Sequence, residues 1–503
     1  MALEILTPKE MGGVDRLAIE QGPLSGIALM ERAGAAVADV VFQRFPGAAR
    51  VDVLCGPGNN GGDGYVAATI LAASGFEVAL WTDGNSRAGS DAEIAAQNCR
   101  LKRQPLEHYE PLPGGVVVDA LYGAGLERPL QDVARAVAEK VSAAGLPVVA
   151  VDLPSGISGS SGEALGATFH ATVTVTFVRK KPGHLLYSGR ALCGDLVVRD
   201  IGISDAVVTE IGSQTFENLP ALWSDDFPRP AENTYKYSRG HVAVFSGGPA
   251  ATGAARLAAM AAARSGAGAV TLLSPPASLA VNAVHLTSII LRRVDGPDDV
   301  QTFFDQRKPS ALVAGPGLGT NNDVAALLAT AIQPTSAARR VVVLDADALT
   351  IMAQEPARWF GLFALDGAPA TILTPHEGEF GRLFPEIHAD MSLSKLEKAR
   401  TAAKSSHSVI VYKGPDTVIA DPDGRAAINS NGTPLLATAG SGDVLSGIIT
   451  GLAGQGMAPF EAACAAVWLH AEAARAFGPG LIAEDLPSML PHVLAGLLMQ
   501  RAP

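Results

Sequence analysis

The sequence predicts an α/β fold made of two three-layer α/β/α domains. Short β-branched runs alternate with Ala-rich stretches of helical period along most of the chain, and this alternation is typical of parallel βαβ units. Hydrophobic residues make up 48% of the chain and charged residues 17%, with 54 glycines. Such a composition favours packed layers joined by tight turns over disorder. Because 503 residues exceed one ordinary hydrophobic core, more than one domain is expected.

The predicted strands fall into two series. The first consists of VDVLC, EVALW, VVVDA and PVVAVDLP, and the second begins at His241 and consists of HVAVFSGG, GAVTLLSP, SALVAGPG, RRVVVLDADAL, ATILTP and HSVIVYKG. Between them, residues 216–239 contain three prolines and mixed charge without periodicity, which is typical of a linker. We therefore expect a boundary near residue 220, with domains over residues 1–220 and 232–503.

Charge and cysteine usage limit the partners. The formal net charge of −12 disfavours non-specific attraction to nucleic acid. The four cysteines are far apart and show neither disulfide-framework nor zinc-ligand spacing. The N-terminus lacks the apolar stretch of a signal peptide. We expect a cytoplasmic enzyme of small molecules with no nucleic-acid or membrane partner, and the sequence leaves open whether it forms a homo-oligomer.

A glycine-rich segment, GPGNNGGDG at residues 56–64, follows the first strand and precedes a helix. Such a position binds phosphate in Rossmann-like domains. The glycines satisfy GxGxxG, and Asp83 follows the next strand at the spacing of a dinucleotide fold. A tight turn with Asp63 as helix N-cap is the alternative. Polar residues crowd a place where hydride-transferring enzymes keep small ones, which favours coordination of another ligand; they are Asn59, Asn60 and Asp63.

Two other strand ends of the first half carry similar chemistry. Asp119 ends VVVDA, and Asp152 and Ser155 follow VVAV. In a doubly wound sheet these strand ends face the same crevice as the glycine-rich segment. The alternative is that each Asp only caps the next helix. Five further titratable residues are expected to be solvated helix-face charges (Asp15, Asp39, Asp132) or structural histidines (His170, His184).

In the second half, Gly440, Ser441, Gly442 and Asp443 stand at the start of an apolar helix. Their backbone N–H groups can converge on one anion. An Asp beside such a cradle would repel the phosphate, but it makes sense as a base that accepts a hydroxyl proton while the N–H groups stabilise a transferring phosphoryl group. A glycine turn capped by Asp443 is the alternative.

The first half resembles the NAD(P)H-hydrate epimerases over residues 1 to about 215, on the motifs SGIALMERAG, GPGNNGGDG, DALYGAG, DLPSG and KPGHLLYSGRALCGDL. The resemblance implies a potassium ion held by oxygen donors, which are Asn60, Asp119 and Ser155. It implies acid/base work by Asp152 at C6 of the substrate. Some relatives have a lysine where this chain has Glu127 and Arg128, which leaves a basic partner open. The hydrated-nicotinamide site is implied to be lined by Asn59, Asn60, Gly61, Gly62, Asp63, Gly123, Ala124, Gly125, Leu126, Glu127, Arg128, Pro129 and Asp152.

The second half resembles the ribokinase-like superfamily and, more narrowly, the ADP-dependent NAD(P)H-hydrate dehydratases over residues 235–500. The motifs are KYSRGHVAVFSGG, TGAARLAAMAAARSGAGAVTL, AGPGLG, VLDADAL, LTPHEGEFGRLF and VYKGPDTVI. The resemblance implies that hydrated nicotinamide lies near Ala254, Gly319, His376 and Asp443. It implies that the adenylate lies near Lys413, Gly414, Pro415, Asp416, Thr417 and Gly442. A solvated strand end is the alternative for Lys413.

The implied reaction is phosphorylation of the C6 hydroxyl by ADP followed by loss of phosphate, which yields AMP. His376 and Glu377 are expected to orient the nicotinamide. Magnesium is expected to bridge the phosphates, with Glu379 as a candidate ligand. The sequence does not indicate whether the enzyme prefers hydrated NADH or hydrated NADPH.

Together the halves predict a bifunctional enzyme that repairs hydrated NADH and NADPH, the epimerase feeding the dehydratase. One rival is a kinase of the ribokinase superfamily with an accessory domain, but LTPHEGEF and KYSRG are not expected in such kinases. Another is a non-catalytic scaffold whose site residues have decayed. The presence of Asn60, Asp119, Asp152 and Ser155 disfavours the scaffold.

Overall fold

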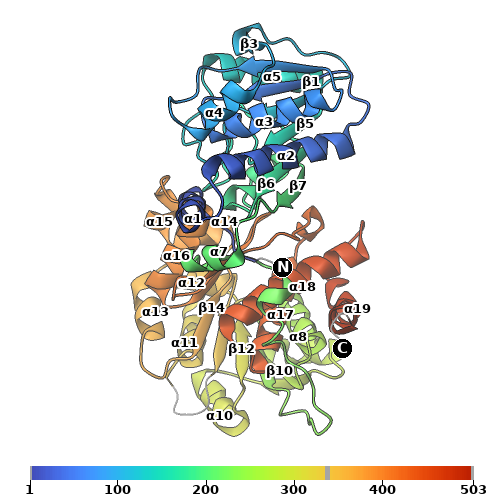
Figure 1. Cartoon of the computed structure of the whole chain (residues 1–503). Coiled ribbons are helices and arrows are strands. Elements are labelled where there is room, and N and C mark those ends of the chain that lie inside the picture. The colour runs from blue at the N-terminus through green and yellow to red at the C-terminus, as the bar shows by residue number, and fades with distance from the viewer. Residues whose placement is uncertain (1–2, 335–339, 500–503) are drawn as a thin grey trace. The chain divides into compact units, whose positions relative to one another are not determined.

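The computed structural model describes residues 3–334 and 340–499. The chain divides into two compact units, one ending at Thr215 and the other beginning at Phe216 (Figure 1). Both are α/β units built on a largely parallel sheet, as the alternation of strand and helix patterns predicts. Each is described separately below.

The first unit contains a seven-stranded sheet with the order β3-β2-β1-β4-β5-β6-β7. All of its strand pairs are parallel. The first six strands follow the Rossmann order, which confirms the Rossmann-like prediction. The strands are β1 (Val51–Cys55), β2 (Val78–Thr82), β3 (Arg103–Pro105), β4 (Val116–Ala120), β5 (Val148–Val151), β6 (Val173–Phe177) and β7 (Asp195–Arg199).

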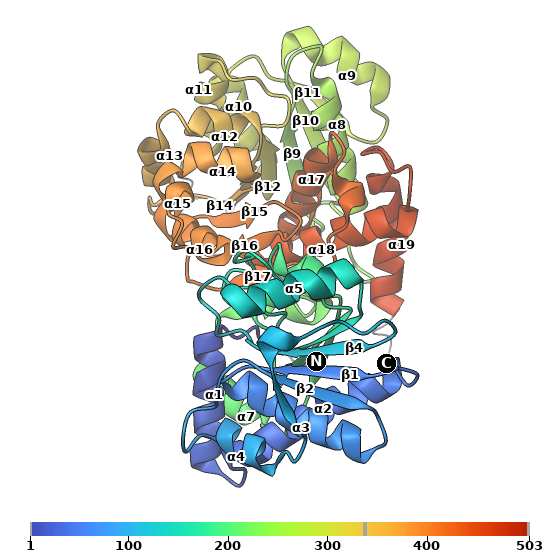
Figure 2. The same ribbon diagram turned by 90° about the horizontal axis from the view of Figure 1, so that it is seen from above.

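Helices cover both faces of this sheet. In β1, Val51, Val53 and Cys55 pack with α2 and α3, whereas Leu54 packs with α5 on the opposite face (Figure 2). This alternation follows from the two-residue period of a strand. The helices are α1 (Pro8–Gln21), α2 (Gly26–Arg44), α3 (Asn59–Ala73), α4 (Asp91–Asn98), α5 (Asp132–Ala144), α6 (Gly189–Leu192) and α7 (Asp205–Ile211), with 3-10 turns η1 (Leu106–His108) and η2 (Pro182–His184).

The glycine-rich segment is helical for most of its length, which corrects the predicted loop. Helix α3 begins at Asn59 with Gly58 as its N-cap, so Asp63 lies inside the helix and is not the N-cap. A Cβ atom at Gly61 would lie 1.9 Å from the Gly56 carbonyl oxygen, and one at Gly64 would lie 2.6 Å from Cβ of Ala120. The glycines therefore let α3 pack directly against the strands.

The second unit contains a ten-stranded sheet with the order β11-β10-β9-β12-β13-β14-β15-β16-β17-β8. It is parallel from β11 to β15 and antiparallel at β16 and β17. The strands are β8 (Thr215–Glu217), β9 (His241–Phe245), β10 (Ala269–Ser274), β11 (Ile290–Arg293), β12 (Ala311–Ala314), β13 (Val341–Leu344), β14 (Ala370–Leu373), β15 (Val409–Tyr412), β16 (Val418–Ala420) and β17 (Ala426–Ile428).

The largest core of the second unit lies between one face of this sheet and α8, α17 and α18. Val242 and Val244 of β9 face this core, while Ala243 between them is also buried and faces the opposite layer. The helices are α8 (Thr252–Arg264), α9 (Leu279–His285), α10 (Pro297–Arg307), α11 (Asn322–Ala331), α12 (Asp347–Met352), α13 (Pro356–Phe363), α14 (Glu377–Leu383), α15 (Pro385–Ala389), α16 (Lys395–Ser406), α17 (Ser441–Gly454), α18 (Pro459–Phe477) and α19 (Leu486–Met499), with 3-10 turns η3 (Pro220–Leu222), η4 (Pro276–Ser278) and η5 (Pro434–Leu436). The predicted three layers are present.

The start of the segment predicted as a linker is instead part of the second unit. Trp223 is fully buried there, and its Nε1 donates a hydrogen bond of 3.2 Å to Oδ1 of Asn218. Nδ2 of Asn218 donates in turn to the Cys464 carbonyl oxygen at 2.9 Å. Pro220 begins the 3-10 turn η3, whereas Pro228 and Pro230 lie in irregular chain, and residues 229–233 are exposed.

Within residues 3–334 and 340–499, no helix combines the length and apolar character that crossing a bilayer would require.

Candidate active sites

The first unit contains a cavity of about 920 Å³ at the carboxyl ends of its strands. Its wall combines α1, α2 and the first turns of α3 with the turn after β4. Of the predicted residues, the wall includes Asn59, Asn60, Asp63, Gly123, Ala124, Gly125, Leu126, Glu127, Arg128 and Asp152. Gly61, Gly62 and Pro129 are not on the wall. A Cβ atom at Gly62 would collide with the Met30 side chain, so that glycine serves packing.

Asp152 follows β5, and three groups hold its carboxylate. Its Oδ1 accepts hydrogen bonds from Nζ of Lys181 at 2.7 Å and from Oγ1 of Thr176 at 2.9 Å, and its Oδ2 accepts one from the Ala124 N–H at 3.0 Å. Burial opposes ionisation, but Lys181 and these hydrogen bonds outweigh it and hold the pKa of Asp152 well below its usual range. Asp152 is therefore an ionised acceptor, and Lys181 is the basic partner that the sequence left open.

His184 forms hydrogen bonds with the backbone of both Asp152 and Lys181. Its Nδ1 accepts from the Lys181 N–H at 2.8 Å, so its Nε2 carries the proton that bonds the Asp152 carbonyl oxygen at 2.7 Å. Burial, with Lys181 nearby, lowers the pKa of His184 to about 4. The structural role expected for this histidine agrees with these contacts, and it positions both members of the ion pair.

Asp119 and Ser155 are hydrogen-bonded to each other next to the cavity, but neither residue lines it. The Ser155 hydroxyl donates to Oδ1 of Asp119 at 2.7 Å, and the Ser155 N–H donates to Oδ2 at 2.7 Å. The same hydroxyl lies 3.0 Å from the Tyr122 carbonyl oxygen. Burial raises the pKa of Asp119 to about 6 despite these bonds. Nδ2 of Asn60 is buried without a hydrogen-bond partner among the described residues.

Two more carboxyl groups face the cavity. Burial, followed by repulsion from Asp152 and Asp15, raises the pKa of Asp63 well above its usual value. Burial likewise raises the pKa of Asp15 to about 6, although Lys181 opposes the shift. The expectation that Asp15 is a solvated helix-face charge is therefore wrong, because that face of α1 closes the cavity.

Gly123 leaves space for the Asn60 amide and the Asp152 carboxylate. A Cβ atom there would lie 2.9 Å from Oδ1 of Asn60 and 3.0 Å from Oδ2 of Asp152. Asp83, which the dinucleotide spacing singled out, instead accepts a hydrogen bond of 2.7 Å from the Tyr122 hydroxyl. That contact leaves Asp83 to orient the turn after β4.

In the second unit, the predicted anion cradle is the start of α17. Gly440 is its N-cap with a φ of 87°, a conformation that favours glycine. Gly442 and Asp443 lie in the first turn, where backbone N–H groups have no acceptor within the helix. Burial and then the charge of Asp345 raise the pKa of Asp443 to about 6. Its carboxyl group is thus suited to accept a proton near neutral pH.

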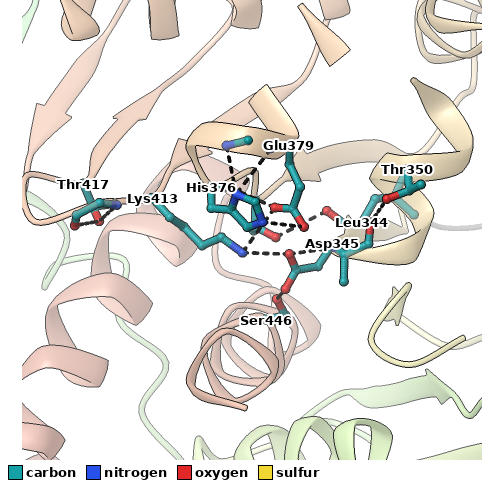
Figure 3. A network of polar contacts seen from close by, with 12 residues as sticks. Leu344, Asp345, Thr350, His376, Glu379, Lys413, Thr417 and Ser446 are labelled. Atoms are coloured by element: carbon teal, nitrogen blue, oxygen red, sulfur yellow. Dashed lines mark hydrogen bonds and ion pairs between the residues drawn. The ribbon is translucent and has the colours of Figure 1, made fainter. Parts of the chain in front are cut away.

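A buried ion pair lies against this turn (Figure 3). Nζ of Lys413 lies 2.9 Å from Oδ1 of Asp345 and 3.8 Å from Oε2 of Glu379. Oδ2 of Asp345 accepts from the Ser446 hydroxyl at 2.6 Å. Burial alone would lower the pKa of Lys413, but Asp345, Glu379 and Asp443 raise it above its usual value. Lys413 is therefore not a solvated strand end.

His376 is the N-cap of α14. Its Nδ1 accepts from the N–H groups of Gly378 and Glu379 at 3.0 and 3.3 Å, and Oε2 of Glu379 accepts from the His376 N–H at 2.8 Å. The imidazole remains half exposed. Glu377, expected to orient the nicotinamide, instead accepts from the Tyr412 hydroxyl at 2.7 Å and pairs with His388 at 2.9 Å.

Two glycine-containing turns bring the other predicted residues close to the cradle. A Cβ atom at Gly317 would lie 3.4 Å from Cβ of Ala254, and one at Gly440 would lie 2.9 Å from Leu257 of the same helix, α8. The Gly319 N–H donates to Oδ2 of Asp347 at 2.8 Å. Helix α8 therefore brings Ala254 near the start of α17, and Gly319 contacts Asp347, whose charge acts on Asp443. Among the described residues, His376 is linked to this place only through Glu379 and Lys413.

The predicted adenylate loop, residues 413–417, is tied to α16. Nζ of Lys395 lies 2.5 Å from Oδ1 of Asp416 and 3.4 Å from the Lys413 carbonyl oxygen. Within the loop, Oγ1 of Thr417 donates to the Gly414 carbonyl oxygen at 2.9 Å. Asp416 is buried, so this residue holds the loop while the backbone around it is available to a ligand.

Sequence reasoning assigned no role to three residues that complete these sites: Lys181, Asp345 and Lys395. Lys181 begins KPGHLL and Asp345 lies in VLDADAL, two motifs that carried the family resemblance. Their presence in those motifs was a usable signal. No comparable pattern marks Lys395. Over the described part of the chain, no group of three or more His, Cys, Asp or Glu side chains has metal-binding geometry.

Comparisons with known proteins agree across the whole chain. A family model described as NAD(P)H-hydrate dehydratase matches residues 242–495, and one described as YjeF-related protein N-terminus matches residues 26–183. A bifunctional NAD(P)H-hydrate repair enzyme Nnr of Moorella thermoacetica is 36% identical, over 98% of this chain and 97% of its own. The Escherichia coli protein of that name is 32% identical, over 93% and 89%.

Among solved structures, an ADP/ATP-dependent NAD(P)H-hydrate dehydratase from Bacillus subtilis, co-crystallised with ATP and Mg²⁺, is 28% identical. It covers 56% of this chain and 98% of its own, with a TM-score of 0.49. The relatives that span both units confirm the resemblance predicted from the motifs. The chain belongs to the family of bifunctional NAD(P)H-hydrate repair enzymes.

Proposed function

We propose that the chain repairs hydrated NADH and NADPH in two reactions. The first unit interconverts the C6 epimers of the hydrate, and the second dehydrates one epimer while converting ADP to AMP and phosphate. The full-length relatives carry the name of this bifunctional activity. A single structural observation supports it best: Asp443, with its pKa raised to about 6, stands in the first turn of α17 beside the buried Lys413–Asp345 pair.

In the dehydratase, Asp443 accepts the proton of the C6 hydroxyl as that oxygen attacks the β-phosphorus of ADP. The N–H groups of the first turn of α17 and the Lys413 ammonium stabilise charge on the transferring phosphoryl group. Loss of phosphate, together with a proton from C5, then restores the C5=C6 double bond. The hydrated nicotinamide lies near Ala254, Gly319 and His376. The adenylate lies on residues 413–417 and at Gly442.

Magnesium fits this unit as a companion of the nucleotide. It usually binds through one or two carboxylates, phosphates and water, and Glu379, 3.8 Å from Nζ of Lys413, is a candidate ligand. The similar Bacillus subtilis dehydratase was co-crystallised with ATP and Mg²⁺. When bound, the ion supplies charge neutralisation to the phosphates.

In the epimerase, the hydrate occupies the cavity of about 920 Å³ and its C6 hydroxyl donates to ionised Asp152. Lys181 keeps this carboxylate charged and fixed. All of the donors of the Lys181 ammonium are used, on Asp152, on Thr176 at 2.9 Å and on the Phe177 carbonyl oxygen at 3.4 Å. Lys181 is therefore a positioning residue.

Potassium fits behind this cavity. The carboxylate of Asp119, the hydroxyl of Ser155 and the Tyr122 carbonyl gather there within hydrogen-bond distances. The Asn60 amide lies beside Gly123, and its Nδ2 has no hydrogen-bond partner among the described residues, so a flipped amide would present its oxygen instead. These are the oxygen ligands that a hard cation prefers, and the ion would offset the burial of Asp119. The four buried free thiols favour the reducing cytoplasm as the place of action.

A coupled assay tests the proposal. Purified protein is mixed with both epimers of hydrated NADH, and ADP is added while the reduced-nicotinamide absorbance is followed. We expect a fast phase from the epimer that the dehydratase accepts and a second phase limited by epimerisation. AMP should form in equal amount to the recovered NADH. A flat trace would refute dehydration, and a second phase no faster than uncatalysed epimerisation would refute the epimerase.

A further inference from the structure

Asp63 is a buried carboxyl group to which neither reaction above assigns a role. It lies in α3 with 9% of its surface exposed, and it forms part of the cavity wall. Among the described residues, no hydrogen-bond donor contacts its carboxyl group, although buried polar groups in proteins are nearly always paired. An unpaired buried carboxyl group that faces a ligand cavity points to a partner on the ligand.

We propose that Asp63, as a neutral carboxylic acid, is the proton donor of the epimerase and works opposite ionised Asp152. This inference rests on the epimerase activity proposed above. It assigns opposite tasks to two carboxyl groups of one cavity, a division that enzymes achieve by giving the two groups different surroundings.

The surroundings of the two groups differ in the required sense. Asp152 has Lys181, Thr176 and the Ala124 N–H as donors, and such charge-assisted bonds favour the ionised form. Among the described residues Asp63 has no donor, and its charged neighbours are mainly the carboxyl groups of Asp152 and Asp15, with Lys181 already paired. Ionisation of Asp63 would therefore add a negative charge to a cavity whose wall also contains the carboxyl groups of Asp152, Asp15, Asp91 and Glu127.

Other titratable groups lie around Asp63, and the cavity wall also contains the carboxyl groups of Asp91 and Glu127. Cys55 of β1 is fully buried, and burial raises the pKa of its thiol. Asp15 lies across the cavity on α1 and is the closest rival. Arg128 also lines the cavity, but a guanidinium group does not give up its proton near neutral pH. Burial and the neighbouring carboxyl groups thus favour the neutral form of Asp63.

The proposed step breaks the C6–N1 bond. Asp63 gives its proton to N1 as the C6–N1 electron pair moves onto that nitrogen, and the hydroxyl oxygen forms a C6=O double bond. The hydroxyl proton passes to Asp152. A protonated carbonyl is so acidic that even a weakly basic carboxylate accepts its proton.

The product is an open-chain aldehyde, with Asp63 ionised and Asp152 protonated. Rotation about C5–C6 then exposes the other face of the aldehyde. N1 attacks C6, returns its proton to Asp63, and the new hydroxyl recovers its proton from Asp152. Both carboxyl groups end as they began, and no oxidant, reductant or other co-reactant is needed.

The test compares Asp63→Asn with Asp39→Asn, which makes the same chemical change on the exposed face of α2. In the coupled assay, the second phase of D63N should be slower by at least about 100-fold, the usual range for general acid catalysis being 10²- to 10⁴-fold. Its first phase and melting temperature should equal those of the wild type. D39N should keep both phases. A second phase of D63N within threefold of the wild type overturns the proposal. A second phase that is slowed about 100-fold in Asp15→Asn but not in D63N also overturns it.

If D63N fails to fold, Asp63→Ala with added formate decides the question, because a small acid can occupy the vacated space. Recovery of the second phase with formate supports the proposal, and no recovery overturns it. Bond cleavage is checked separately in ¹⁸O-labelled water. Retention of the original oxygen during single turnovers supports C6–N1 cleavage, whereas incorporation of one label in each epimerisation overturns it. If wild type itself lacks a catalysed second phase, the epimerase proposal has failed and not the assignment of Asp63.

Discussion

Nζ of Lys413 lies 2.9 Å from Oδ1 of Asp345, directly against the first turn of α17. A Cβ atom at Gly442 would lie 3.5 Å from the same ammonium nitrogen and 3.8 Å from Oδ2 of Asp345. The pair therefore acts at short range on Asp443, the next residue in that turn. This relationship leads to the first two predictions.

Asp443→Asn should lower the dehydration rate by at least about 100-fold, because it removes the base and keeps the shape of the side chain. ADP binding should survive or tighten, since the variant has one negative charge less beside the phosphates. Epimerisation should not change. Steady-state kinetics and calorimetric titration with ADP separate the two effects. Turnover within threefold of the wild type would contradict the base assignment, and loss of ADP binding would make Asp443 a structural cap.

The pH dependence of dehydration should follow the ionisation of Asp443. Its pKa is raised to about 6 by burial and by Asp345, and only the ionised form accepts a proton. The kcat/KM for the hydrate should therefore fall as pH drops below about 6. Asp345→Asn removes one cause of the raised pKa, so its curve should lie at lower pH. The ionisation of free ADP is the same in both assays, so a difference between the two curves reports on the enzyme. Coincident curves would show that Asp345 does not act on Asp443.

Asp152→Asn should abolish catalysed epimerisation and leave dehydration of the accepted epimer intact. The variant removes the ionised acceptor and leaves the Lys181 ammonium buried without its carboxylate. Breaking a buried pair in this way costs about 3–5 kcal/mol, so the first unit should also unfold more easily. Chiral separation of the hydrates measures the first effect, and hydrogen exchange in β5 and β6 measures the second. Epimerisation at the wild-type rate would show that Asp152 is only structural.

Lys395→Ala should raise the KM for ADP about tenfold, the effect of about 1.4 kcal/mol, and change kcat little. The lysine ties Asp416 and the Lys413 carbonyl to α16, so its loss should loosen the loop that holds the adenylate. Lys404→Ala, on the exposed side of the same helix, is the matched control. An unchanged KM for ADP in the first variant would place the nucleotide elsewhere.

Each unit should fold and act alone when the chain is cut at the observed division. A fragment of residues 216–503 retains Trp223 and Asn218, whereas one of residues 232–503 lacks them. Removing a buried tryptophan costs about 3–5 kcal/mol, so the shorter fragment should be less stable by at least about 3 kcal/mol in urea unfolding. Equal stability would mean that the segment before residue 232 is a linker after all.

The sequence was sufficient for the architecture because strand and helix periods are local. VDVLC and VVVDA form β1 and β4 as predicted, and the Rossmann order follows from the connection rules of parallel sheets. The first residues after Phe216 were misjudged because their prolines indicate a break, while Trp223 is buried against Trp468, which lies more than 200 positions away.

The sequence predicted those site residues that lie in recognisable motifs. Asp152 and Lys181 are 29 positions apart, and only the return of the chain after β6 brings them together. Asp15 looked like a helix-face charge because the sequence does not show which face of α1 closes a cavity. The tie from Lys395 to the adenylate loop likewise depends on how α16 packs beside β15.

The small space at Gly123 has a consequence for the comparison of related sequences. Any larger residue there would need the space between the Asn60 amide and the Asp152 carboxylate. A relative that keeps every polar side chain of the first unit but carries Ala or Ser at this position is therefore expected to have a slower epimerase, because the Asn60 amide or the Asp152 carboxylate must move aside. Position 123 can thus report on the efficiency of the first unit, which a search for the acidic residues alone would miss.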